Sequence, residues 1–86
     1  MTPYSIEYTA SAAKALQKLD ANVVKPILAA IQKLAEEPRP AGSVKLVGSD
    51  RLRVRVGDYR VLYVIDDAVL VITVVKVGHR RDVYER

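Results

Sequence analysis

The chain begins with alternating apolar and polar residues and then changes to a helical spacing. Residues 4–8 alternate with period two, which is typical of a half-buried strand. Thr9 or Ser11 can then cap a helix, because a hydroxyl side chain accepts a hydrogen bond from a free N–H of the first turn. The apolar residues that follow recur at i, i+3, i+4 and i+7, namely Ala12, Ala15, Leu16 and Leu19. This pattern predicts a strand followed by an amphipathic helix.

A second apolar stripe with the same spacing predicts another helix. Asp20 or Asn22 is its candidate N-cap, and the helix is expected to end near Glu37. The predicted buried stripe consists of Val23, Ile27, Ala30, Ile31 and Leu34. Pro26 lies beyond the first turn, where proline removes a backbone hydrogen bond and clashes with the preceding turn. The helix is therefore expected either to start late or to bend at this residue.

The second half of the chain is rich in β-branched residues and is predicted to form a sheet. A loop dense in proline and glycine, residues 36–43, separates it from the helices. The predicted strands are residues 44–47, 52–56, 59–65 and 69–77. The last one is apolar on both faces and is expected to be central, with Leu70, Ile72 and Val74 on one face and Val69, Val71, Val75 and Val77 on the other.

This order of elements predicts an α+β fold. An N-terminal strand and a two-helix hairpin precede a three- to four-stranded, mostly antiparallel sheet, and the helices are expected to pack on one face of it. With 86 residues the chain is expected to form one domain, residues 1–86.

The strand at residues 52–56 has two chemically different faces. Its apolar residues alternate strictly with arginines: Leu52, Val54 and Val56 on one side, Arg51, Arg53 and Arg55 on the other. A two-residue turn at Gly57-Asp58 would place Arg55 opposite Arg60, and would pair Val56 with Tyr59 and Val54 with Val61. Arg60 then joins the other three, and we call Arg51, Arg53, Arg55 and Arg60 the arginine face.

Stability of the sheet does not explain the arginine face, because directly opposed like charges destabilise a sheet by up to about 1 kcal/mol. An anionic ligand would explain it, and the alternative is the solvated outer face of a small basic protein. If Asp66-Asp67 also closes a tight turn, Arg60 lies opposite Thr73. The same side of the sheet then carries Leu62, Val71, Val75 and Val77. Such a surface suits a nucleotide or a wrapping peptide, unless loops cover part of it.

Composition favours a polyanionic partner. The formal net charge is +4, and seven of the eight arginines lie in residues 44–86. Arginine suits phosphate because its planar fork donates two parallel hydrogen bonds. The absence of cysteine excludes disulfides, thiolate metal sites and cysteine nucleophiles. No apolar run reaches the roughly 18 residues that span a bilayer, and no export signal is visible, so the expected location is the cytoplasm.

The C-terminal residues 78–86 are expected to leave the last strand close to the arginine face. They would add His79, Arg80, Arg81 and Tyr84 to it. The alternative is a frayed and solvated basic tail, with Tyr84 simply packed against the sheet.

Three segments resemble the RelE/ParE superfamily of toxins from type II toxin–antitoxin operons. They are KLVG at residues 45–48, LRVRVGDYRVLY at 52–63 and VGHRRDVY at 77–84, and the resemblance extends over nearly the whole chain. It implies a ribosome-dependent endoribonuclease that cuts mRNA in the A site without a metal or cofactor, by attack of a ribose 2′-OH on the adjacent phosphate. It also implies a cognate antitoxin that wraps the toxin in a hetero-oligomer.

The resemblance also implies roles for individual residues. Arg60 matches an arginine that contacts the scissile phosphate, Arg80 one that stabilises the transition state, and Tyr84 a tyrosine that orients or activates the nucleophile. The expected substrate-binding residues are Arg51, Arg53, Arg55, His79 and Arg81. Arg53 and Arg55 stand where relatives have lysines, and arginine stays protonated near neutral pH. Proton transfer would then fall to Tyr84, to His79 or to substrate and solvent, although a lone histidine in a basic turn can equally be a bystander.

Two other functions fit the sequence. A ParE-like toxin that inhibits DNA gyrase has the same fold and lacks the residues that cut RNA, and retention of Arg60, Arg80 and Tyr84 favours the nuclease over it. A non-catalytic module that binds RNA or the ribosome and blocks translation is the third possibility.

Overall fold

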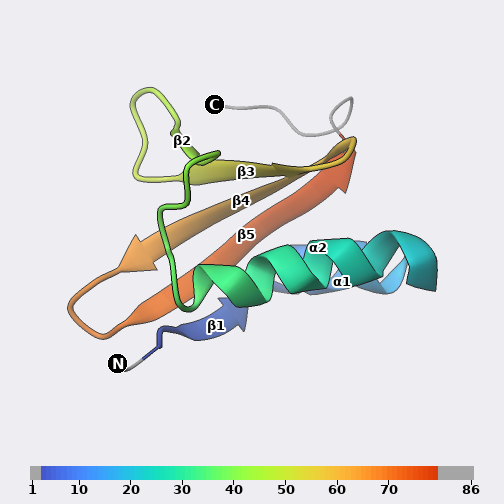
Figure 1. The fold of residues 1–86 in the computed structure, drawn as a ribbon, viewed down its shortest axis with the longest axis horizontal. Helices are drawn as coiled ribbons and strands as arrows, with labels where there is room; N and C mark the ends of the chain where they lie inside the picture. Colours follow the sequence, from blue (N-terminus) through green and yellow to red (C-terminus); the bar gives the residue numbers. More distant parts are fainter. Residues whose placement is uncertain (1–2, 80–86) are drawn as a thin grey trace.

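The computed structural model describes residues 3–79, which form one sheet with two helices packed on one face (Figure 1). The elements in chain order are β1 (Ser5–Tyr8), α1 (Ala10–Gln17), α2 (Ala21–Leu34), β2 (Val44–Lys45), β3 (Leu52–Val56), β4 (Tyr59–Asp66) and β5 (Val71–His79). The strand order across the sheet is β1-β5-β4-β3-β2. The predicted α+β fold is confirmed, and β1 joins the C-terminal strands to give five in all.

The pairing of strands is antiparallel except at one edge. β1 runs parallel to β5, and the other neighbours, β5 with β4, β4 with β3 and β3 with β2, are antiparallel. β5 has a partner on each side, as its two apolar faces predicted. β2 forms only two residues of ladder, because the predicted strand 44–47 ends when the chain turns at Leu46.

Both helices begin where the sequence offers a cap. Thr9 caps α1, since its Oγ1 accepts a hydrogen bond of 3.1 Å from the Ala12 N–H, and Ser11 lies inside the helix. Asp20 occupies the N-cap position of α2 but makes no side-chain cap bond. α2 includes Pro26, so of the two alternatives for this residue the late start is wrong, and the helix ends at Leu34, before Glu37. Neither helix of the described residues is long and apolar enough to span a bilayer.

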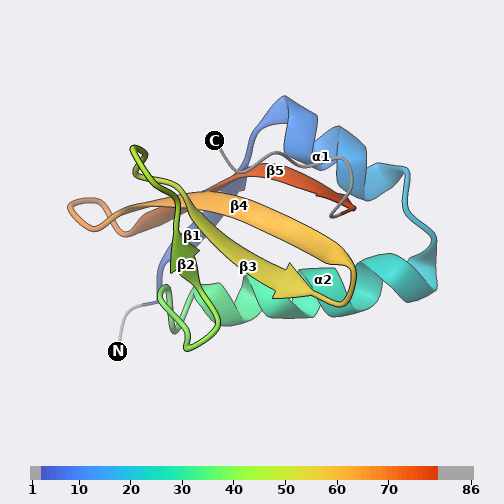
Figure 2. The ribbon, with the colours of Figure 1, turned by 90° about the horizontal axis from the view of Figure 1, so that it is seen from above.

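The main core lies between the helices and the sheet. α1 lies under β5 and α2 under β3, so together they cover one face (Figure 2). The buried residues of this core are Ala12, Ile27, Ile31, Leu34, Val61, Tyr63, Ile72, Val74 and Val77. The hydroxyl of Tyr63, a fully buried residue, donates a hydrogen bond of 2.8 Å to the Pro38 carbonyl. The loop between helices and sheet is thereby fastened to the core.

The register between β4 and β5 differs from the prediction. Asp66 pairs with Val71, so the turn consists of the four residues 67–70 and is not a tight Asp66-Asp67 turn. Leu70 closes it with a φ of 56°, in the left-handed region that non-glycine residues rarely adopt. The longer turn shifts the pairing of the whole strand, and Thr73 lies opposite Val64 instead of Arg60.

A β-bulge then changes which β5 residues face which side. Tyr63 pairs with Val74, but the next pair is Leu62 with Lys76, which leaves Val75 as the extra residue on β5. Val77 consequently lies in the helix-side core, and the prediction that Val75 and Val77 share the side of the arginines is wrong for Val77. Lys76 lies there in its place.

The face of the sheet away from the helices is partly covered by a loop. Leu46, which follows β2, is 4% exposed and packs with the fully buried Leu62 in a second small apolar cluster. The helices do not reach this side (Figure 1). The outer face is therefore apolar and closed near β2, while the part nearer the β3–β4 turn carries the arginines.

Candidate nucleic-acid interface

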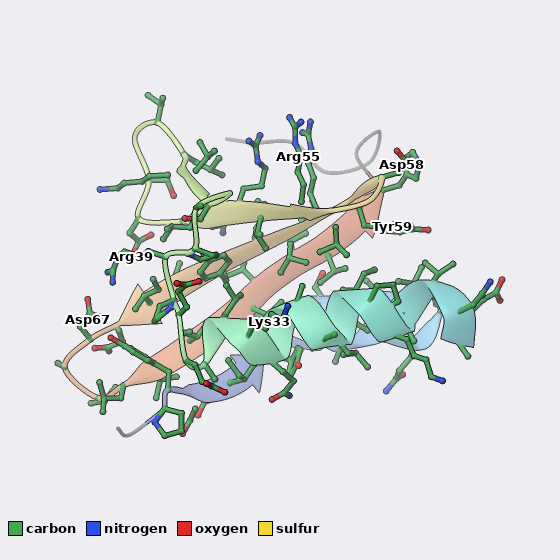
Figure 3. All side chains as sticks on the ribbon, viewed as in Figure 1. Lys33, Arg39, Arg55, Asp58, Tyr59 and Asp67 are labelled. Atoms are coloured by element: carbon green, nitrogen blue, oxygen red, sulfur yellow. The ribbon has the colours of Figure 1, made fainter. Side chains whose placement is uncertain are left out.

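The β3–β4 hairpin places arginines from two strands on one surface. Gly57 adopts a φ of +60°, as a two-residue hairpin turn requires, and Arg55 pairs with Arg60. The pairs Val56 with Tyr59 and Val54 with Val61 also agree with the predicted register. Arg55 points away from the helix layer (Figure 3). The predicted register of this hairpin is confirmed, and it determines the side on which the charges lie.

The arginine side chains differ in exposure along this surface. Arg55 is exposed, whereas Arg51, Arg53 and Arg60 are partly buried. The Nε atoms of Arg53 and Arg60 are withdrawn from solvent. Neighbouring strands are about 4.8 Å apart, so the stems of Arg55 and Arg60 stand side by side. Side chains that are already restricted in this way lose less rotamer entropy when they bind an anion.

A small hollow lies at the turn end of the arginine face. It has a volume of about 120 Å³ and is lined by Arg55, Gly57, Asp58, Tyr59 and Arg60. Two guanidinium groups and one carboxylate therefore border the same depression. Gly78 of β5 lies opposite Arg60 and contributes no side chain to this surface.

Sequence reasoning missed Lys76 as a member of this surface. Its position opposite Leu62 places it on the outer side of the sheet, two strands away from Arg53, which also pairs with Leu62. Plain alternation from Ile72 and Val74 would put Lys76 in the core. Only the bulge at Val75 reverses this assignment, and nothing in the local sequence marks the bulge.

His79 is the last described residue, and its side chain lies on the other side of β5 from this surface. It pairs with Tyr59, and the two rings meet edge to face with centroids 5.5 Å apart and an interplanar angle of 78°. Tyr59 packs against the helix-side core. The structure therefore does not bring the His79 ring among the arginines. Arg80, Arg81 and Tyr84, the other predicted site residues of the tail, lie outside the described residues.

A second polar cluster lies at the opposite end of the sheet (Figure 3). The carboxylate of Asp67 accepts a hydrogen bond of 2.5 Å from the Tyr4 hydroxyl and forms an ion pair of 3.0 Å with Arg39. The bond from Arg39, followed by that from Tyr4, lowers the pKa of Asp67. The same contact with the Asp67 carboxylate raises the pKa of Tyr4. We call these three residues the Asp67 cluster; the sequence gives no local signal for it, because its members are far apart along the chain.

A larger hollow of about 410 Å³ lies beside the Asp67 cluster. Its lining residues are Arg39, Ser43, Lys45, Asp50, Leu52 and Ile65. Charges of both signs border it, together with apolar side chains of β3 and β4. None of the predicted site residues contributes to it.

The chain matches the family model described as the ParE toxin of the type II toxin–antitoxin system parDE, over residues 6–84. It is 33% identical to the toxin RelG of Mycobacterium tuberculosis over an alignment of 88 residues, and this alignment covers 98% of this chain and 99% of RelG. The fold is similar to that of a chain in the toxin–antitoxin complex RelBE2 of M. tuberculosis, with a TM-score of 0.81 and 28% identity over 91% of this chain and 99% of that one. It is also similar to the intact RelBE complex of Escherichia coli, with a TM-score of 0.78 and 28% identity over 88% of this chain and 95% of that one.

Proposed function

The chain belongs to the RelE/ParE superfamily of toxins from type II toxin–antitoxin systems, and from that premise we propose that it is a ribosome-dependent, metal-independent endoribonuclease that cleaves mRNA in the A site. The observation that supports this proposal is the hairpin in which Arg55 stands opposite Arg60 with Arg53 beside them. Opposed cations weaken a sheet, and an RNA phosphate placed over them turns that repulsion into attraction. Similarity to the toxin RelG over nearly the whole chain supports a RelE-type toxin.

The proposed reaction is an internal transfer of the phosphoryl group. The 2′-oxygen of one ribose forms a bond to the adjacent phosphorus, and the bond from phosphorus to the 5′-oxygen of the next nucleotide breaks. A proton leaves the 2′-hydroxyl and another reaches the 5′-oxygen, which yields a 2′,3′-cyclic phosphate and a 5′-hydroxyl. The enzyme must align attack and departure and neutralise the pentacoordinate oxyanion. A cluster of guanidinium groups can perform the second task without taking up or releasing a proton.

Some of the proposed site residues bind phosphate, and others orient the attacking group or transfer protons. Arg60 is proposed to contact the scissile phosphate and Arg80 the transition state, and Tyr84 orients the attacking hydroxyl. Binding of the flanking RNA falls to Arg51, Arg53, Arg55 and Arg81. His79 faces Tyr59 on the other side of the strand, so we assign it no proton in this reaction. The acceptor of the 2′-proton is then Tyr84 or the substrate and solvent.

A cognate antitoxin is the proposed protein partner. Several structurally similar toxins were solved as toxin–antitoxin complexes. Cover of the arginine face, or simple bulk that excludes the toxin from the A site, would each prevent cleavage. The proposed place of action is the cytoplasm, where the ribosomes are.

Inhibition of DNA gyrase is the second candidate, because the matching family model carries the ParE description. Purified toxin should be added to a reconstituted translation system and, in parallel, to a gyrase supercoiling assay. Cleavage that maps to the A-site codon and requires the ribosome supports the nuclease. Arg80→Ala and Tyr84→Phe should each abolish most of it, and if cleavage continues unchanged in both variants, the assigned chemistry is wrong. Inhibited supercoiling with intact mRNA would establish the alternative.

A further inference from the structure

The β-bulge at Val75 adds a cation to the arginine face that the alternation of β5 would place elsewhere. We propose that Lys76 is a further phosphate-binding residue on this surface and that Thr9 is the positioning residue that holds it there. The inference deepens the proposed function and rests on it, because the phosphate belongs to the RNA that the arginine face would bind.

The register determines the side on which Lys76 lies. Lys76 pairs with Leu62, whose side chain is buried under Leu46 on the outer face, while its neighbour Val77 pairs with Val61 in the helix-side core. Side chains of paired residues in a ladder project to the same side. Lys76 and Arg53 therefore flank Leu62 from the two adjacent strands.

The spacing of these cations suits an extended phosphodiester chain. Arg55 and Arg60 form one level of the ladder, and Arg53 and Lys76 form the next, two residues or about 6.8 Å further along. Within the second level the two residues stand about 10 Å apart across the intervening strand. Two successive phosphates can thus each meet a pair of cations.

The surroundings of Lys76 leave its charge available. The residue is partly buried and its stem lies beside the buried Leu62, an arrangement in which lysine keeps its ammonium group in water. Among residues 3–79 no carboxylate forms an ion pair with it; the ion pair found there joins Arg39 to Asp67. A compact ammonium on a flexible stem can approach a phosphate from several directions.

Thr9 holds the bulge from the adjacent strand. Tyr8 with Val74 is the last pair between β1 and β5, and beyond it the Thr9 N–H donates a bond of 3.0 Å to the Val74 carbonyl. The Thr9 hydroxyl donates a bond of 2.8 Å to the carbonyl of Val75, the bulged residue, while its oxygen accepts from the Ala12 N–H. One side chain thus joins the first turn of α1 to the point where β5 changes face.

The test uses ribosomes programmed with an mRNA whose A-site riboses are 2′-deoxy, so that the toxin binds without cutting. Lys76→Gln should weaken binding about five- to tenfold and reduce the slope of log affinity against log salt by about 0.7, the value for one phosphate on a single strand. Lys33→Gln is the matched control, because Lys33 lies on α2 in the helix layer (Figure 3). It should change neither quantity, and Lys76→Arg should restore both.

Repeating the binding measurement on ribosomes without mRNA shows whether the phosphate that Lys76 contacts belongs to mRNA or to ribosomal RNA. A loss confined to programmed ribosomes assigns it to mRNA, and an equal loss on empty ribosomes assigns it to ribosomal RNA. If wild-type toxin cleaves normal mRNA but Lys76→Gln binds like Lys33→Gln, the Lys76 assignment is overturned alone. If wild-type toxin neither binds nor cleaves, the proposed function is overturned with it.

Single and double substitutions of Thr9 and Lys76 test the role of Thr9. Thr9→Val should raise KM with little change in kcat, whereas Thr9→Ser, which keeps the hydroxyl, should not. In Thr9→Val the further substitution Lys76→Gln should cost less than it does in the wild type, because the two residues act on one contact. A lowered Tm with an unchanged KM, or full additivity of the two substitutions, would show that Thr9 only stabilises the fold.

Discussion

The two ends of the sheet use charged side chains in opposite ways. In the Asp67 cluster a carboxylate lies between a guanidinium and a phenol, and the three residues join the segment before β1, the loop before β2 and the β4–β5 turn. At the hairpin end the sheet sets Arg55 directly against Arg60. The first arrangement pairs opposite charges and fastens the chain, while the second brings like charges together on the outer face. Like charges placed on neighbouring strands against their mutual repulsion indicate a ligand of the opposite charge.

Loss of Arg60 should have the largest effect on function. Arg60→Ala is expected to reduce the rate of mRNA cleavage on programmed ribosomes by about 100-fold or more, because the scissile phosphate, which gains negative charge in the reaction, loses a donor. Its Tm separates a loss of activity per folded molecule from a loss of folded protein. Single-turnover cleavage and thermal unfolding measure the two quantities. If the variant loses activity only in proportion to the loss of folded protein, Arg60 serves the fold and the contrast between the two ends of the sheet is wrong.

Loss of the Tyr63 hydroxyl should have the largest effect on stability at the Asp67 end. Tyr63→Phe removes the part-buried hydrogen bond to the Pro38 carbonyl and is expected to lower the free energy of unfolding by about 1 kcal/mol. Tyr8→Phe is the control, since Tyr8 is 37% exposed, and it should be neutral. Urea unfolding gives both values, and cleavage per folded molecule should be unchanged in both variants. Equal stability of the two variants would show that the bond contributes nothing.

Removal of the charge of Arg55 should separate stability from function. Arg55→Gln is expected to raise the free energy of unfolding by about 0.5 kcal/mol, since directly opposed like charges cost a few tenths to 1 kcal/mol. Binding to ribosomes should weaken and lose salt dependence at the same time. Urea unfolding at low salt detects the gain, which should shrink at high salt. A decrease in stability at low salt would mean that the arginines support the hairpin.

The smallest expected effect is the pH dependence that comes from Asp67. Its pKa lies below the ordinary 3.8 in the folded state, so the ion pair stabilises the protein above about pH 4 and the contribution disappears as the pH falls through the folded value. Asp67→Asn should therefore be slightly less stable than the wild type at pH 7, and the difference should vanish toward pH 2. Urea midpoints across this range test the sign. A difference that grows on acidification would refute the role of the cluster.

The hairpin could be predicted because its information is local. Gly57 and Asp58 define the turn, and the alternation of Arg53 and Arg55 with valines defines the faces. The β4–β5 connection could not, because Asp66 and Asp67 are equally compatible with a two-residue and a four-residue turn. Each added residue in that turn shifts every later pair.

The candidate site could likewise be predicted only where its position depends on neighbouring residues in the sequence. The arginines of β3 and β4 lie where the pattern placed them, but Lys76 depends on a bulge held by Thr9, a residue 67 positions earlier in the chain. The edge contact of His79 with Tyr59 depends on the same shifted register. Interactions between residues so far apart carry no trace in the spacing of nearby residues.

The parallel pairing of β1 with β5 has a kinetic consequence. It joins Ser5 to Val71, residues that are 66 positions apart, and closing such a long loop is a slow step that local contacts must precede. A nascent chain can form its helices and the β3–β4 hairpin early, but the sheet closes only once residues 71–79 have been synthesised. Thr9 then meets Val75 and Lys76 reaches the arginine face. Under the proposed function, the RNA-binding surface is thus complete only after β1 and β5 have paired.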